Sequence, residues 1–238
     1  LNVTYVLASR EQNIAKESYK DTTPFDEYIK AFSEEKNMRL LGSLNIQYIL
    51  TSFKLSNKLQ PIFVTYIFDN KLPVYIYENP YFMPRWYFAE NIKWTNEDKA
   101  FEDLQKIEDF KKTTLLETIN LNDPALSYKS SPNDKIELEL YTAGKLILKT
   151  RTKNYRFLVF SESRQPFWQA TVNGVDVPLY TANYLWQAVL VPPGENTIEF
   201  RYPNLWEQSV ISGQSYIDKF LNPVRNRART QNVSHPKL

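Results

Sequence analysis

Cysteine is absent from this chain of 238 residues, histidine occurs once and glycine five times. The lack of cysteine removes disulfides, thiol catalysis and cysteine–zinc sites together. The single histidine, His235, lies near the end of the chain, which argues against zinc hydrolysis through His ligands and against Ser-His-Asp catalysis. The sequence also has no glycine-rich phosphate loop, no GxGxxG motif and no Asp-x-Asp pair. It therefore predicts no metal site, no cofactor and no catalytic residue of these kinds.

Long apolar runs and a surplus of one charge are also missing. The 29 basic and 27 acidic residues are interspersed and leave a net charge of +2, so we predict no nucleic-acid partner. No run approaches the roughly 18 apolar residues of a membrane-spanning helix. The chain begins with Leu1 rather than Met, and we interpret it as a fragment of a larger protein.

Aromatic residues, in contrast, are abundant at 15%. The N-terminal half of the chain contains patterns typical of both helices and strands. Thr23 and Pro24 predict the start of a helix whose inner face carries Phe25, Ile29 and Phe32. A second helix is expected near Asn96, capped by Thr95 or Asn96. Its inner face carries Phe101, Leu104 and either Ile107 or Glu108. Strands are expected over 45–50, 62–68, 74–78, 85–94 and 113–117.

The C-terminal half reads as all-β. Alternation at Ile136, Leu138 and Leu140 predicts a half-buried strand, and 155–163 is apolar on both faces, as a central strand would be. Asn173-Gly174 predicts a hairpin, with Val172 opposite Val175 and an apolar face that extends to Trp168 and Leu179. The fold class predicted is an α+β N-terminal domain (1–118), a polar linker (119–134) and an all-β sandwich domain (135–203). A helix and a disordered basic tail (204–238) follow.

Three segments in this order carry a resemblance to a known family. They are RLLGSLNIQYILTS (39–52), LPVYIYENPYFMPRWYFAENIKW (72–94) and QPFWQATVNGVDVPLYTANYLWQAVLVPPGENTIEFRYP (165–203). Over roughly 38–203 the chain resembles the C-terminal extracytoplasmic region of the bacterial membrane protein YfhO family. These are large polytopic proteins related to the GT-C type of glycosyltransferase. The family reads Pro-Gly-Trp where this chain has Pro166-Phe167-Trp168.

The resemblance implies a location at the cell membrane, on its extracytoplasmic face. It implies as partner the membrane-embedded remainder of the parent protein, with a cell-envelope glycan or a lipid-linked sugar as ligand. No position of this chain matches the family's catalytic acid, so no catalytic residue is carried over. The function implied is an accessory or interaction region, non-catalytic by itself, that contributes to the handling of acceptor or cell-wall glycan.

Candidate ligand-binding residues come from the aromatic-rich stretch after the hairpin. Tyr180, Asn183, Tyr184 and Trp186 are candidates because aromatic faces on a β-sandwich stack on sugar rings. Each has a structural alternative: Tyr184 and Trp186 share a face with apolar residues and suit core or inter-domain packing. Tyr180 and Asn183 are expected in an exposed loop.

Two other functions stay open at this point. A stand-alone carbohydrate-binding module predicts exposed aromatics and measurable sugar affinity. A hydrolase predicts two facing acids in a cleft, with Glu162 and Asp176 as the pair considered, and a raised carboxyl pKa. The alternative for both acids is a solvated position at a strand end.

Overall fold

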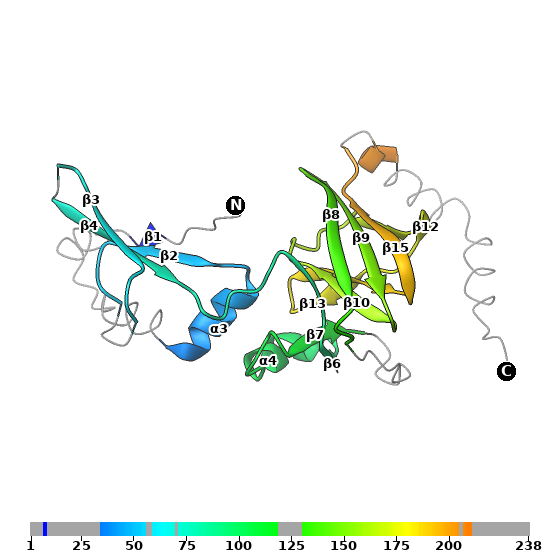
Figure 1. Cartoon of the computed structure of the whole chain (residues 1–238), viewed down its shortest axis with the longest axis horizontal. Coiled ribbons are helices and arrows are strands. Elements are labelled where there is room, and N and C mark those ends of the chain that lie inside the picture. Colours follow the sequence, from blue (N-terminus) through cyan, green and yellow to red (C-terminus); the bar gives the residue numbers. More distant parts are fainter. Residues whose placement is uncertain are drawn as a thin grey trace.

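The computed structural model describes residues 7–8, 34–55, 59–69, 71–118, 130–204 and 207–210. This part of the chain is mostly β and forms three sheets, of four, six and five strands (Figure 1). The helix expected from Pro24 and nearly all of the predicted tail lie outside the described residues. None of the described helices is long and apolar enough to cross a membrane.

The four-stranded sheet comes from the N-terminal part of the chain. Its strands, in spatial order, are β1 (Leu7–Ala8), β2 (Tyr48–Thr51), β4 (Leu72–Glu78) and β3 (Phe63–Ile67). Helix α3 (Glu35–Ser43) covers one face of this sheet, because Met38 packs with Ile49 and Tyr77 in one buried cluster. The strands predicted over 45–50, 62–68 and 74–78 are confirmed as β2, β3 and β4.

The other two sheets face each other in a sandwich-like arrangement. The six-stranded sheet has the order β5 (Trp86–Phe88), β10 (Arg156–Phe160), β14 (Trp186–Val191), β13 (Tyr180–Ala182), β7 (Thr113–Glu117) and β6 (Asn91–Thr95). The five-stranded sheet has the order β12 (Val175–Asp176), β11 (Gln169–Val172), β15 (Gly194–Arg201), β9 (Lys145–Thr152) and β8 (Lys135–Thr142). A buried apolar cluster contributed by β9, β10, β11, β14 and β15 fills the space between them.

Strand pairing runs across the boundary predicted at 119–134. Strands β5, β6 and β7 precede that segment, yet they lie in the same sheet as β10, β13 and β14, which follow it. The split into a separate α+β domain over 1–118 and a sandwich over 135–203 is therefore not confirmed. The reason is physical: the free edges of β10 and β13 are completed by strands from far away in the sequence.

Helix α3 and the six-stranded sheet also share contacts. Trp186 Nε1 on β14 donates a hydrogen bond to the carbonyl oxygen of Ser43, at 2.6 Å. A second buried cluster joins the partly buried Leu40 of α3 to Leu104 of the short helix α4 (Ala100–Gln105) and Leu115 of β7. A 3-10 turn, η1 (Glu97–Lys99), precedes α4, and the predicted cap is confirmed because Asn96 Oδ1 accepts from the Lys99 backbone N–H.

Several local predictions hold and others fail. Strand β10 is buried along its whole length between β5 and β14, as predicted, and Val172 pairs with Val175. Val175 itself is exposed, because it lies next to the turn on β12, a two-residue strand at the edge of its sheet. Leu138 and Leu140 are exposed because β8 is an edge strand with a bulge between them. Phe101, expected on the inner face of its helix, is exposed as well.

A buried ion pair ties the sandwich together at one end. Arg156, the first residue of β10, places Nη1 2.6 Å from Oδ2 of Asp134, and both side chains are almost fully buried. Its Nη2 donates to the carbonyl oxygen of Ala89, at 2.8 Å, and its guanidinium lies over the ring of Phe88. Burial lowers the pKa of Arg156, and the charge of Asp134 opposes that shift. The pair thus links β10 to the residue that precedes β8 in the opposite sheet.

Removal of one partner should be costly, because it leaves a buried charge without compensation. We expect Arg156→Met to lower the free energy of unfolding by about 3–5 kcal/mol. The control is Arg151→Met, which breaks the pair that Arg151 makes with Glu195 on exposed strand positions and should cost no more than about 1 kcal/mol. Urea unfolding followed by tryptophan fluorescence measures both. Equal losses in the two variants would contradict a structural role for the buried pair.

Candidate functional site

A cavity of about 800 Å³ opens beside Tyr184, at the end of the sandwich where β10 leaves the sheet. We call it the Tyr184 cavity. Its walls come from η1, the end of β7, strand β13, the turn between β13 and β14, and the loop between β10 and β11. The residues that line it are Glu97, Glu117, Ser163, Arg164, Gln165, Pro166, Thr181, Tyr184 and Leu185.

Arg164 fixes the loop between β10 and β11 against the β13–β14 hairpin. Its backbone N–H donates to the carbonyl oxygen of Leu185, at 2.8 Å. Its Nη1 donates to Thr181 Oγ1, at 2.7 Å. The hydrogen bond to Thr181 orients the guanidinium group, while Arg164 remains exposed. Its other N–H groups can therefore donate to a ligand in the cavity.

Tyr184 is held in an uncommon backbone conformation. Its φ is 71° and that of Asn183 is 46°, so both residues lie in the left-handed region. Buried Asn183 anchors the turn: its Oδ1 accepts from the Leu115 N–H at 2.9 Å, and its Nδ2 donates to the Tyr87 hydroxyl at 3.0 Å. Tyr184 is 44% exposed, and the centroid of its ring lies 5.6 Å from that of exposed Phe101. Tyr184 thus brings the one aromatic ring among the residues that line this cavity, and Phe101 packs against that ring.

The carboxyl of Glu117 is electrostatically perturbed. Burial at the end of β7 raises its pKa, and the negative charge of Glu97 raises it further, whereas Arg164 lowers it. The cavity thus combines a carboxyl that binds its proton more tightly than usual, a second acid, a guanidinium, hydroxyls and an exposed aromatic ring. Such a mixture of hydrogen-bonding groups beside an aromatic face suits a polyhydroxylated ligand.

A second cavity, of about 590 Å³, shares Ser163 and Gln165 with the first and lies on the other side of the same loop. Aromatic side chains dominate its walls, so we call it the aromatic cavity. They are Tyr141, Phe160, Trp168 and Tyr202. Glu162 lies at its edge, in an ion pair with Arg85, whose guanidinium also lies 5.9 Å from the centroid of the Tyr141 ring.

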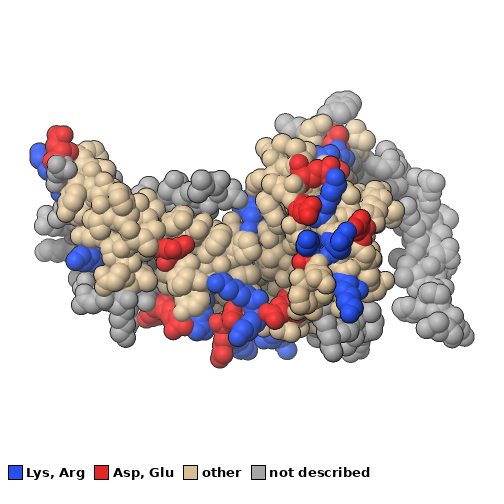
Figure 2. All heavy atoms as spheres, in the orientation of Figure 1, with Lys and Arg blue, Asp and Glu red and all other residues tan. Residues whose placement is uncertain are grey.

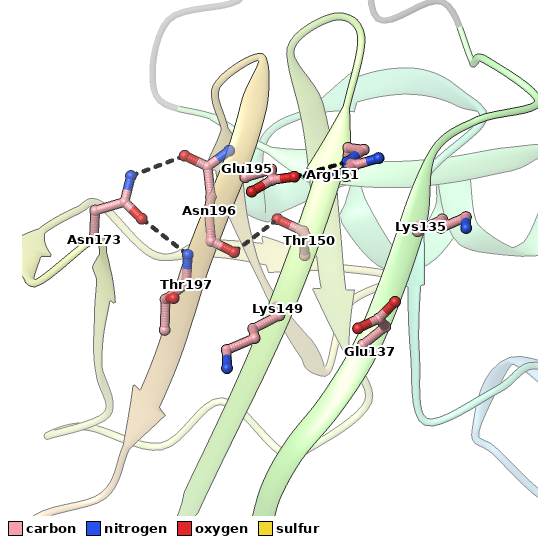
Figure 3. Close-up of a pocket in the computed structure, with 9 residues that line it drawn as sticks. All are labelled: Lys135, Glu137, Lys149, Thr150, Arg151, Asn173, Glu195, Asn196 and Thr197. Carbon is pink, nitrogen blue, oxygen red and sulfur yellow. Dashed lines mark hydrogen bonds and ion pairs between the residues drawn. The ribbon is translucent and has the colours of Figure 1, made fainter.

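A third hollow, of about 400 Å³, lies over β8, β9 and β15 and is polar (Figure 3). The side chains of Asn173 and Asn196 point toward one another: Asn173 Nδ2 donates to Asn196 Oδ1, and Asn173 Oδ1 accepts from the Thr197 N–H, both at 2.9 Å. Arg151 pairs with Glu195 beside them. Because the asparagine and Arg151–Glu195 groups already satisfy one another, this hollow is a weaker candidate for ligand binding than the Tyr184 cavity.

The structure separates the four predicted ligand-binding residues. Tyr184 alone of the four lines one of these cavities. Tyr180 lies on β13, half-buried, with its ring 5.1 Å from that of Phe157, and Trp186 is half-buried at the contact with Ser43. Asn183 is buried rather than exposed, because its amide satisfies backbone and side-chain groups of other strands. The structure thus gives it a positioning role next to Tyr184.

The two acids considered as a hydrolytic pair occupy different features. Glu162 pairs with Arg85 beside the aromatic cavity, and Asp176 lies on β12. Sequence reasoning missed Glu97, Glu117, Arg164 and Thr181 as residues of one site. No spacing in the sequence brings these four together, because they come from four separate elements. Among the described residues there is no cluster of three or more potential metal ligands of the His, Cys, Asp or Glu type.

Comparison with known proteins gives no match: neither a family model, nor a curated protein, nor a solved structure matches this chain.

The loop between the two cavities contains a strained residue whose relief is measurable. Phe167 has a φ of 78°, a region that costs a residue with a Cβ roughly 1–2 kcal/mol and costs glycine nothing. We expect Phe167→Gly to be more stable than Phe167→Ala by about 1 kcal/mol, although glycine has the larger entropy in the unfolded chain. At Gln165, which lies outside the left-handed region, glycine should instead be less stable than alanine. Thermal unfolding of the four variants measures these differences in stability. The same order of stability for glycine and alanine at both positions would contradict strain at Phe167.

The raised pKa of Glu117 predicts a dependence of stability on pH. A carboxyl with a higher pKa in the folded than in the unfolded chain binds more protons when folded. Stability therefore falls as pH rises from the ordinary glutamate pKa through the raised one. Glu117→Gln removes this titration, so it should be more stable than the wild type at about pH 7, with a difference that shrinks below about pH 4. Urea midpoints at the two pH values test this, and an unchanged difference would refute it.

Proposed function

We propose that this chain is a non-catalytic glycan-binding region on the extracytoplasmic side of a larger membrane protein, and that the Tyr184 cavity holds the glycan. In this role the region positions a cell-envelope glycan or a lipid-linked sugar for the membrane-embedded remainder of the parent protein.

The observation that carries the proposal is the conformation of Tyr184. An exposed tyrosine is kept in the lining of a cavity by a backbone conformation that tyrosine rarely adopts, and a buried asparagine holds that turn in place. Residues in such conformations persist only when their surroundings determine them, and they cluster at ligand-binding positions. A tyrosine face beside Arg164, Glu117 and Thr181 offers both stacking and hydrogen bonding, the two contacts that a sugar ring uses.

The membrane-associated part of the proposal rests on the resemblance to the YfhO family. The left-handed φ of Phe167 supports it, because this is the position at which that family has glycine in its Pro-Gly-Trp motif. A free-standing carbohydrate-binding module is the alternative. Residues of this chain line the cavity, so binding is testable on the isolated chain in both cases.

A second candidate function, glycoside hydrolysis, is favoured by one observation. The raised pKa of Glu117 next to Glu97 is what a general acid beside a second carboxylate requires. Hydrolysis predicts shortened products, whereas binding alone returns the glycan intact.

The full chain should bind a glycan on an array of bacterial cell-envelope saccharides, and the affinity for the best of them is then measured by calorimetric titration. We expect Tyr184→Ala to weaken binding at least about tenfold, the equivalent of about 1.4 kcal/mol, through the loss of the stacking face. The matched control is Tyr155→Ala, which removes an exposed tyrosine at the other end of β10 and should leave the affinity unchanged.

Failure of the wild type to bind any saccharide, or equal weakening in the two variants, would rule out the glycan site. Circular dichroism on each variant confirms that the fold is retained. Mass spectrometry of the recovered saccharide separates the two functions, since cleavage that Glu117→Gln abolishes would favour the hydrolase.

A further inference from the structure

The most apolar exposed segment of the described chain lies far from the Tyr184 cavity, on β3. Within positions 62–68 the large apolar side chains that are exposed are Ile62, Phe63, Val64, Tyr66, Ile67 and Phe68. Figure 2 shows that the surface around the β3–β4 hairpin carries charge mainly at its tip. The turn there contains Asp69 and Lys71, which are of opposite sign. A contiguous patch of exposed apolar side chains on a protein surface marks an interaction site.

Strand β3 is also a free edge. It is the last strand of its sheet, beyond β4, so its outer backbone groups face no described strand. The other edge strands described are protected in the usual ways: β1 and β12 have two residues each, β5 has three, β6 carries Lys93, and β8 carries charged residues and a bulge. Strand β3 has five residues and no charge, proline or bulge.

The apolar side chains of β3 occupy both faces of the sheet. Phe63 and Ile67 lie on one face, since they pair with Ile76 and Leu72, while Val64 and Tyr66 lie on the other face with Tyr75. All four are exposed. A flat surface laid on one face of the sheet would leave the other face in water. A strand added at the edge of β3 instead places its side chains beside the apolar residues on both faces of the sheet.

The sequence of β3, FVTYI, is self-complementary when reversed. In an antiparallel pair centred on Thr65, Phe63 faces Ile67 of the second copy, Val64 faces Tyr66, and Thr65 faces itself. Every opposed pair is apolar or neutral, and aromatic residues meet β-branched ones, a favourable cross-strand combination. A lipid surface is less well matched, because attachment to anionic lipid needs clustered Lys and Arg, whereas the two charges in the adjoining turn balance.

We propose that β3 pairs with β3 of a second copy of this chain, antiparallel and across a two-fold axis at Thr65, so that one sheet continues through both molecules. Such an isologous contact closes after two copies. The inference is independent of the glycan site.

The absence of cysteine from the chain makes a direct test available. Opposed residues of an antiparallel pair have Cα atoms about 4.5–5.5 Å apart, within the range that a disulfide spans. Thr65→Cys, a nearly isosteric change, should therefore form a covalent dimer under mild oxidation of the full chain at micromolar concentration. Val175→Cys is the matched control, an exposed position on the edge strand β12, and should stay monomeric on a non-reducing gel.

Register is tested by a mixture of two variants. Phe63→Cys and Ile67→Cys should each cross-link poorly alone, because identical positions are four residues out of register, and should form a heterodimer when mixed. Wild-type protein should elute as a dimer in light-scattering chromatography, whereas Thr65→Lys and Thr65→Glu should each be monomeric and an equimolar mixture of them dimeric.

Three results would overturn the proposal. They are a wild type that is monomeric throughout the micromolar range, cross-linking of Val175→Cys equal to that of Thr65→Cys, or open-ended assemblies in place of a dimer. A monomer that sediments with phosphatidylcholine vesicles would assign the patch to a lipid surface instead.

Discussion

The sandwich depends on the buried ion pair between Arg156 and Asp134. Two charges are kept out of water there because Arg156 also donates to the Ala89 carbonyl and lies over the Phe88 ring. The apolar cluster between the sheets supplies most of the driving force, but that force has no direction. The ion pair, in contrast, requires a particular geometry. It joins the start of β10 in one sheet to the residue before β8 in the other, and so fixes the position of the two sheets relative to each other at that end.

The opposite end of β10 positions the candidate site. Ser161, the next residue, donates its backbone N–H to the carbonyl oxygen of Arg85, at 2.7 Å, and the Arg85 side chain pairs with Glu162. Arg164 then reaches β13 and the β13–β14 turn. The loop that separates the two cavities is therefore held by a fully buried strand on one side and by a hairpin on the other. Sites supported in this way keep their geometry better than sites on unsupported loops.

Sequence reasoning succeeded where structure depends on neighbouring residues. Asn173-Gly174 predicted the register of its hairpin and Asn96 the start of a helical turn, since both act within a few positions. It failed where partners are distant. The Asn183 side chain, polar and in a turn, suggested exposure, but its amide binds the backbone of Leu115, 68 positions away. The same limit hid the pairing of β5 with β10, and the polar stretch at 119–134 suggested a linker regardless of which strands it joined.

The choice of residue at 184 is hard to explain by the turn alone. Most of the left-handed residues described are of types that adopt this conformation readily, namely glycine, asparagine and aspartate, and the aromatic exceptions are Phe68, Phe167 and Tyr184. At position 184 the left-handed conformation of a residue with a side chain costs roughly 1–2 kcal/mol, and the hydrogen bond between Asn183 and Leu115 holds this turn in place. Tyr184 is nearly half exposed and lines a cavity, and its ring contacts exposed Phe101, so burial of the side chain returns only part of the free energy. A contact that the ring makes with a ligand accounts for the tyrosine better than its contribution to the fold.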